Sequence, residues 1–306
     1  MRIDRKGLKW SARDAMRAAQ PNAMLMTFVY LLLTAGLTVV VGLLVTDPVG
    51  EVMHLYQRGL PLERAIPLAV AGVGSVGLFA NILMFIFGLV VDFGYRNWCL
   101  ATARGEQGEL GNLIDGFSMV GRILWLRILI MLYGFLWYLA IFMPALLGVL
   151  AGTLIPGIGP LVSVGVFLIA VAAYISRILR YSMSVYCLAD EPEMGASWAL
   201  RRSKWMMEGH VKDYFLLRLS FIGWYVLGML LVTAVEGAVI AVMGGPHLLM
   251  ETDIAVLEQI GNSAVMTVSL ALASWPLEVW LTPYVALTEC KFYDQIKDKS
   301  AEQHRF

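Results

Sequence analysis

Long apolar segments alternate with short polar ones along the 306-residue chain. Six of the apolar segments reach about 20 residues, enough for a helix with a rise of about 1.5 Å per residue to cross a hydrocarbon core of about 30 Å. Lipid offers the backbone no hydrogen-bond partner, so we expect each crossing to be an α-helix. The predicted crossings are residues 24–45, 76–100, 123–150, 161–186, 214–235 and 263–288. The pattern predicts an all-α, polytopic membrane protein with one membrane domain over residues 1–290 and a charged, frayed tail over 291–306.

Three polar segments between the crossings carry apolar residues at helical spacing, and we predict an interfacial amphipathic helix in each. The apolar faces consist of Leu8, Ala12, Ala15, Met16 and Ala19 in residues 8–19, of Leu110, Leu113, Ile114, Phe117 and Val120 in the second helix, and of Ala196, Ala199, Leu200, Ser203, Met206 and Met207 in the third. Lys9, Trp10, Arg13 and Arg17 lie opposite the first of these faces.

The order amphipathic helix, crossing, outer turn, crossing occurs three times, which suggests a threefold hairpin repeat. The four residues from Trp98 to Ala101 resemble those from Tyr186 to Ala189, although any hairpin membrane protein with interfacial anchors would look partly similar. Asp47 and Pro48 can cap and start a short outer helix that ends near Gly59.

The composition is 59% hydrophobic and 15% charged, which excludes a soluble protein because a soluble surface needs more polar residues. The net charge is zero, so the distribution of charge is the informative quantity. Of the 23 basic residues, only Arg58 and Arg64 fall on the predicted outer side. The positive-inside rule then places both termini in the cytoplasm and all three cysteines on the reducing side, where we expect no disulfides.

Eight ionisable residues fall in the predicted crossings, at one common depth in the cytoplasmic third. They are Asp92, Arg96, Arg127, Arg177, Arg180, Arg218, Glu278 and Glu289. Five are basic and three acidic, so complete pairing would leave two positive charges, and a basic pocket at headgroup level could hold an anionic lipid phosphate. The alternative is that these side chains snorkel to the interface or pair locally, for example Asp92 with Arg96.

Glu278 lies between Pro276 and Pro283 in the last crossing. The two prolines interrupt the helical hydrogen bonds and release carbonyls that need partners. A glutamate at such a break is typical of an ion or proton site in a transporter, but it can equally be a packing kink whose carboxylate meets one of the five arginines.

No enzymatic motif is evident. The histidines, His54, His210, His247 and His304, are scattered and have no second ligand at metal spacing. The glycines from Gly72 to Gly77 spell a dinucleotide-binding pattern, but no strand precedes them, and close helix packing or a loose helix start explains them better. We therefore assign no catalytic residue, metal or cofactor. Nucleic-acid binding has little support, because topology explains the basic residues.

Several short motifs resemble an uncharacterised bacterial six-span family that is classed as a domain of unknown function. The resemblance rests on Tyr181 to Met183, Tyr186 to Pro192, Arg202, Ser203, Met207, Gly209, His210, Ser220 to Trp224, Pro283, Tyr284, Phe292 and Tyr293, and more loosely on the first amphipathic helix, Gly116 and Phe117. That family looks related to the membrane domain of some glycerophosphodiester phosphodiesterases. Nothing matches their soluble barrel, so their catalytic activity is not carried over. The resemblance implies a multi-pass protein of the bacterial cytoplasmic membrane.

Our hypothesis is a non-enzymatic protein that binds an anionic lipid or amphiphile in its cytoplasmic half. The predicted ligand-binding residues are Arg177 and Arg180 as anion contacts, Arg127 and Arg218 as supporting charges, and Tyr284 and Trp224 as interfacial walls. One alternative is a proton-coupled transporter that uses Glu278, and others are a membrane-embedded enzyme or a structural or regulatory subunit. Membrane lipids are the partners this hypothesis implies, and no protein partner is indicated.

Overall fold

The computed structural model describes residues 3–38, 48–153, 157–244 and 263–303, and every regular element in these ranges is a helix. The elements are α1 (Arg5–Ala18), α2 (Ala23–Leu31), η1 (Leu32–Gly36), α4 (Pro48–Gln57), α5 (Leu62–Arg104), η2 (Leu110–Met119), α6 (Val120–Thr153), α7 (Gly159–Ile178), η3 (Leu179–Tyr181), α8 (Ser184–Asp190), η4 (Pro192–Met194), α9 (Ala196–Met206), α10 (Val211–Leu219), α11 (Ile222–Gly244) and α13 (Ala264–Gln303).

Five helical segments of the described chain are long and apolar enough to cross a membrane. A sixth is obtained if α1 and the α2–η1 helix, which meet at 86°, count as one broken span. The long helices leave large apolar side chains uncovered by protein, such as Leu161 of α7 at 75% and Met229 of α11 at 64% exposure. Such continuous apolar surface requires lipid around it. The chain is therefore an all-α, multi-pass membrane protein, as predicted.

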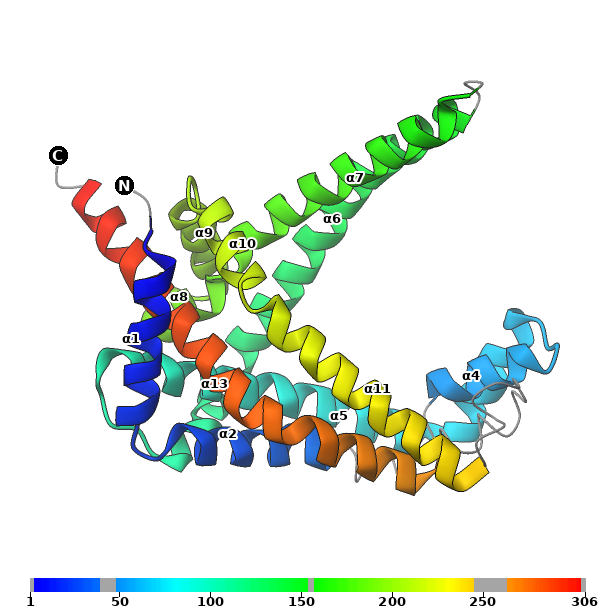
Figure 1. The fold of residues 1–306 in the computed structure, drawn as a ribbon, viewed down its shortest axis with the longest axis horizontal. Coiled ribbons are helices and arrows are strands. Elements are labelled where there is room, and N and C mark those ends of the chain that lie inside the picture. The colour runs from blue at the N-terminus through cyan, green and yellow to red at the C-terminus, as the bar shows by residue number, and fades with distance from the viewer. Residues whose placement is uncertain (1–2, 39–47, 154–156, 245–262, 304–306) are drawn as a thin grey trace.

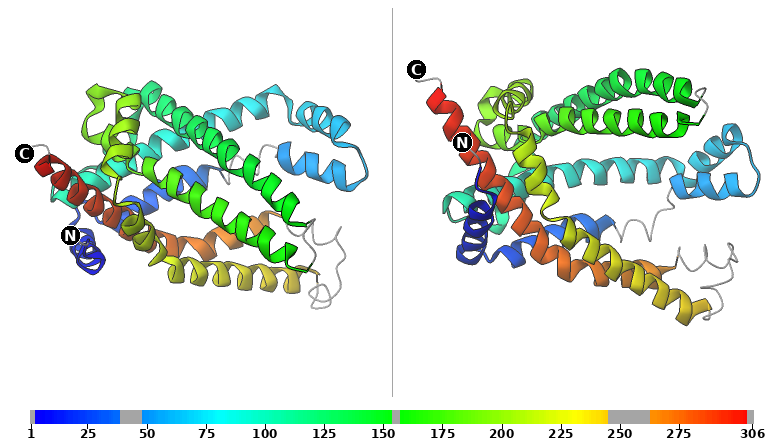
Figure 2. Two further views of the ribbon diagram at one scale, coloured as in Figure 1. Left: turned by 90° about the horizontal axis from the view of Figure 1, so that it is seen from above. Right: turned by 45° about the horizontal axis from the view of Figure 1, so that its top comes forward.

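Three helical arms extend from one end of the molecule, which we call the base (Figure 1). The base comprises α1, η2, α8, α9 and α10 with the adjoining ends of α5, α6 and α13. The arms are α4 with α5, α6 with α7, and α2 with α11 and α13, and Figure 2 shows them diverging away from the base. The order basal helix, outward helix, returning helix is met three times along the chain, which is the order expected of the hairpin repeat.

Two predicted boundaries differ from the structure. The crossing expected over residues 161–186 is a helix only to Ile178, after which the turn η3 redirects the chain into α8. The tail expected to fray from residue 291 continues α13 to Gln303. Its Phe292, Tyr293 and Ile296 are buried, because they lie at helical spacing on the face of α13 that packs against the base.

The outer turns agree with the sequence pattern where they are described. Helix α4 starts at Pro48 and ends at Gln57, and the chain reverses at Gly59, whose φ of 87° suits a residue without a Cβ. Asp47, residues 39–45 of the first predicted crossing, and His247 and His304 lie outside the described residues.

The basal helices differ in how many of their residues are buried, from two of 14 in α1 to five of seven in α8. Helix α1 buries Leu8 and Ala12 and lies across α13 (Figure 1). Helix α9 buries five of the six residues assigned to its apolar face, and the sixth, Met207, is buried just beyond its end. In η2, which is a 3₁₀-helix, only Leu113 of the predicted face is buried, while Leu110, Ile114 and Phe117 are exposed.

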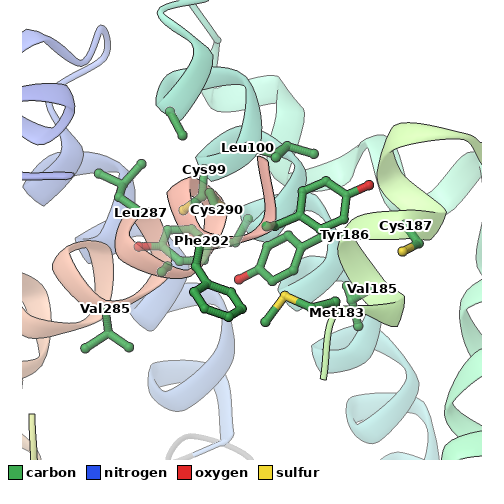
Figure 3. Packing of buried hydrophobic residues seen from close by; sticks show 14 of the residues in the cluster. Cys99, Leu100, Met183, Val185, Tyr186, Cys187, Val285, Leu287, Cys290 and Phe292 are labelled. Carbon is green, nitrogen blue, oxygen red and sulfur yellow. The ribbon is translucent and has the colours of Figure 1, made fainter. Parts of the chain in front are cut away.

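The main core lies in the base and joins α5, α8 and α13 (Figure 3). Cys99 of α5, Cys187 of α8 and Cys290 of α13 are free thiols in this core. The two similar stretches that suggested a repeat both contribute to this core, in which Trp98 and Tyr186 are fully buried. Burial of bulky apolar side chains is thus concentrated where the three arms join.

Glycines allow η2 and α5 to approach within backbone contact. A Cβ added to Gly94 of α5 would lie 2.6 Å from the carbonyl oxygen of Asn112, and one added to Gly116 would lie 2.7 Å from that of Val90. No side chain fits at these separations. The two glycines therefore determine how closely η2 lies on the arm that α5 forms.

We expect Gly94→Ala to lower the free energy of unfolding by about 1–3 kcal/mol, because the added methyl group would push η2 away from α5. Gly88→Ala is the matched control in the same helix, since nothing lies within 4 Å of its added Cβ. Helix propensity alone predicts that the control is about 0.5–1 kcal/mol more stable than wild type. The measurement is thermal unfolding of the purified proteins in detergent, and equal midpoints for the two variants would contradict the packing argument.

Candidate functional site

A buried carboxylate, Glu289 of α13, is the centre of a polar network in the base. The carboxylate accepts hydrogen bonds of 3.1 Å from the hydroxyls of Tyr186 in α8 and Tyr214 in α10. It also pairs with Arg218 of α10 at 2.5 Å and with Arg96 of α5 at 3.8 Å. Its side chain is only 5% exposed, so these partners replace the water that the carboxylate loses on folding.

Asp92 extends the network to a further helix. Its carboxylate pairs with Arg96 one turn later in α5, at 3.1 Å, and with Arg127 of α6. The Asp92–Arg96 pair is the local pair that the sequence spacing predicted. The network thus contains three guanidiniums and two carboxylates and borders a cavity of 170 Å³.

A second ionic cluster links the ends of three helices. Arg104 at the end of α5 bonds to Asp190 of α8 and Asp294 of α13, both at 2.7 Å. Asp190 also pairs with Lys297 and accepts a 2.9 Å hydrogen bond from Tyr293. Every charge in this cluster has a partner, so its role is to join the helix ends.

None of the ion pairs among the described residues includes Arg177 or Arg180, the two predicted anion contacts. The Arg177 guanidinium lies 4.5 Å from the centre of the Trp137 ring, and the Nε of Arg180 is buried with no hydrogen-bond partner in the described part of the chain. Arg127 and Arg218 belong instead to the Asp92 and Glu289 network.

The two predicted aromatic walls do lie together, in a different place. Trp224 and Tyr284 line a cavity of 630 Å³ between α1, α11 and α13, which we call the aromatic cavity. Trp280 stands between them, with ring centres 4.8 Å from Trp224 and 5.4 Å from Tyr284. The remaining lining residues are Arg13, Met16, Arg17, Asn22 and Met24.

The basic residues of the aromatic cavity come from α1. The guanidinium of Arg13 lies 5.0 Å from the centre of the Tyr284 ring, and Arg17 follows one turn later and is exposed. Neither has an ion-pair partner among the described carboxylates. Sequence reasoning placed both on the polar face of the first helix but could not show that this face meets α11 and α13.

Glu278 lies apart from both polar clusters, on the outer part of α13. It lines a separate cavity of 400 Å³ with residues of η1, α11 and α13. None of the five arginines forms an ion pair with it, so the local-pairing alternative from the sequence does not apply to this glutamate. Within the described ranges, no three His, Cys, Asp or Glu side chains are grouped in a way that could hold a metal ion.

We expect Glu289→Gln to destabilise the protein by about 2–3 kcal/mol, because the partly buried Arg96 and the half-exposed Arg218 would lose the counter-charge that they share. Glu193→Gln, a change at an exposed carboxylate of η4, is the control. Thermal unfolding in detergent measures both. A second substitution, Arg218→Gln, should recover part of the loss in the Glu289→Gln background, and strictly additive effects would contradict the coupling.

No match to this chain was found among the curated proteins or among the solved structures. The model of a family described as "Protein of unknown function (DUF975)" matches residues 1–300. This range includes all the crossings, the polar network and the aromatic cavity. The chain therefore belongs to the DUF975 family, an uncharacterised family of proteins.

Proposed function

We propose that the protein binds the headgroup of an anionic lipid or amphiphile in the aromatic cavity. The observation that carries this proposal is the pair Arg13 and Arg17, two guanidiniums without a carboxylate partner among the described residues, beside three aromatic rings. In place of Arg177 and Arg180, these two arginines are the proposed anion contacts. Trp224 and Tyr284 keep the role of walls, and Trp280 joins them.

The chemistry of the aromatic cavity suits a phosphate that carries apolar chains. Guanidinium groups bind phosphate oxygens through paired N–H donors, and tryptophan and tyrosine favour the level of the lipid headgroups. A volume of 630 Å³ falls within the range of about 300–1,000 Å³ that is usual for ligand pockets. The exposed apolar side of α11, including Tyr225 at 50% and Val226 at 47% exposure, offers a path for acyl chains.

The surrounding charges support the choice of Arg13 and Arg17. Arg96, Arg127 and Arg218 are each paired with Asp92 or Glu289, so binding an anion there would require a change of partner. Lys9 of α1 adds a third positive charge, with its ammonium group 4.0 Å from the centre of the Phe221 ring. We place the base on the cytoplasmic side, because most basic residues outside the membrane belong to it. The bacterial origin and the relation to glycerophosphodiester phosphodiesterases stay predictions.

We expect Arg13→Ala/Arg17→Ala to lose an anionic lipid that the wild type retains through purification, with a fall of about tenfold in its enrichment over bulk lipid. Arg5→Ala/Lys6→Ala is the matched control, since it removes two exposed positive charges from the same helix. A third variant, Arg177→Ala/Arg180→Ala, tests the two arginines that the sequence analysis selected as anion contacts. Mass spectrometry measures the lipids retained by the wild type and by the three double variants.

Three outcomes are informative. Selective loss in Arg13→Ala/Arg17→Ala supports the aromatic cavity, whereas selective loss in Arg177→Ala/Arg180→Ala would return the site to the end of α7. The same bulk lipid mixture in every preparation would refute lipid binding by this protein, and the arginines would then be topology anchors.

Transport remains a second candidate function, favoured by the position of Glu278 in a cavity of its own. If Glu278 couples transport to protons, Glu278→Gln should abolish pH-dependent uptake into proteoliposomes while the thermal unfolding midpoint stays unchanged, because the side chain has no ion-pair partner among the described residues to lose. Uptake with an unaltered pH profile would exclude this role.

A further inference from the structure

The cavity beside Glu278 combines one carboxylate with an apolar lining. Among the described residues that line it, Glu278 alone is charged. Two lining hydroxyls are present, but Thr267 donates to the carbonyl of Ser263 and Ser274 to that of Ala271, within their own helix. Their protons are therefore used, and no described side chain is hydrogen-bonded to the carboxylate of Glu278.

A second cavity adjoins the first and is wholly apolar. It has a volume of 440 Å³ and shares Ala271 and Trp275 with the cavity of Glu278. Its other lining residues are Leu32, Leu33, Gly36, Leu37, Val268 and Leu272. Trp275 borders both cavities, and its ring makes an edge contact with Phe28 at 6.1 Å between centres. The two cavities thus place apolar volume and a carboxylate beside the same tryptophan.

An ionised carboxylate inside a membrane protein needs a counter-charge, and such residues commonly mark binding sites. The arginines of the base cannot supply one, because Arg96, Arg127 and Arg218 are paired with Asp92 and Glu289. A cationic ligand would supply this counter-charge. Because apolar residues and the Trp275 ring surround the carboxylate, the matching ligand is a cation with apolar substituents, which can also lie against an aromatic face.

We infer that the two adjoining cavities form a binding site for a hydrophobic cation, such as an amine or phosphonium with apolar groups, and that Glu278 is its counter-ion. The site is distinct from the aromatic cavity in place and in the sign of its ligand. If the protein is a transporter, as in the second candidate function, this ligand is its substrate class. Equilibrium binding is measured without transport, so the binding site and the transport function can be refuted separately.

The test uses tetraphenylphosphonium and tetraphenylborate, two probes of nearly the same shape and opposite charge. Equilibrium dialysis measures the binding of each radiolabelled probe to the purified full-length protein in detergent. The variants are Glu278→Gln, which removes the charge, and Glu278→Asp, which keeps it. Glu236→Gln is the matched control, because Glu236 is an exposed carboxylate of α11 in the same arm.

We expect the wild type to bind tetraphenylphosphonium more tightly than tetraphenylborate. Glu278→Gln should weaken phosphonium binding by about tenfold or more, while Glu278→Asp and Glu236→Gln should retain most of it. Trp275→Leu should weaken binding of both probes, since it removes an aromatic wall and leaves the charge. Thermal unfolding midpoints within the wild-type range would exclude misfolding as the cause.

Other results would overturn the inference. Equal binding of both probes by the wild type would show that charge does not select the ligand. Undiminished phosphonium binding in Glu278→Gln, or an equal loss in Glu236→Gln, would show that Glu278 is not the counter-ion. Phosphonium binding that depends on Glu278, together with no uptake into proteoliposomes, would uphold the site and refute only the transport function.

Discussion

The interaction on which the rest of the structure depends is the set of bonds around Glu289. Its carboxylate joins α13 to α8, α10 and α5 in one place, and Arg96 and Asp92 carry the connection on to α6. Each of the three arms therefore has at least one helix tied into this network. In a low-dielectric region such charges are stable only when all of them have partners, so the network specifies one arrangement of the arms and penalises others.

The distribution of burial follows from this arrangement. Protein covers the ends of the arms in the base, where bulky residues such as Trp98, Tyr186 and Phe292 are fully buried. Along the arms it covers little, and Leu161 and Met229 remain largely exposed. In water such exposure would drive aggregation, but lipid chains are as apolar as these side chains and there is no gain from burying them in protein. The arms can consequently diverge while the base stays closely packed.

Helix α13 contributes residues to the polar network and to both proposed sites. Its inner part contributes Glu289 to the network, its middle contributes Trp280 and Tyr284 to the aromatic cavity, and its outer part contributes Glu278. The proposed anion site and the proposed cation site thus share one helix but use different residues along it. Arg13 and Arg17 line the aromatic cavity, and no described carboxylate does; Glu278 lines the other cavity, and no described basic residue does. Each proposed site therefore has its own electrostatic environment.

The sequence by itself determined the class of the protein and the positions of most helices. Hydrophobic length sets where a helix can cross lipid, so the long apolar segments could be read directly, and the Asp92–Arg96 pair followed from its spacing along one helix. Local pattern also placed α4 between Pro48 and Gly59. The prediction that the tail frays after residue 291 was wrong, because the burial of Phe292 and Ile296 depends on helices that are distant in the sequence. Tertiary structure alone decided which charges meet. Arg127 and Arg218 were chosen as supporting charges from their depth, yet they pair with Asp92 and Glu289 on other helices. Arg13 and Arg17, in contrast, lie beside the aromatic rings because α1 folds across α13. Depth in the membrane is encoded by position along one helix, but pairing across helices depends on packing, which no single segment specifies.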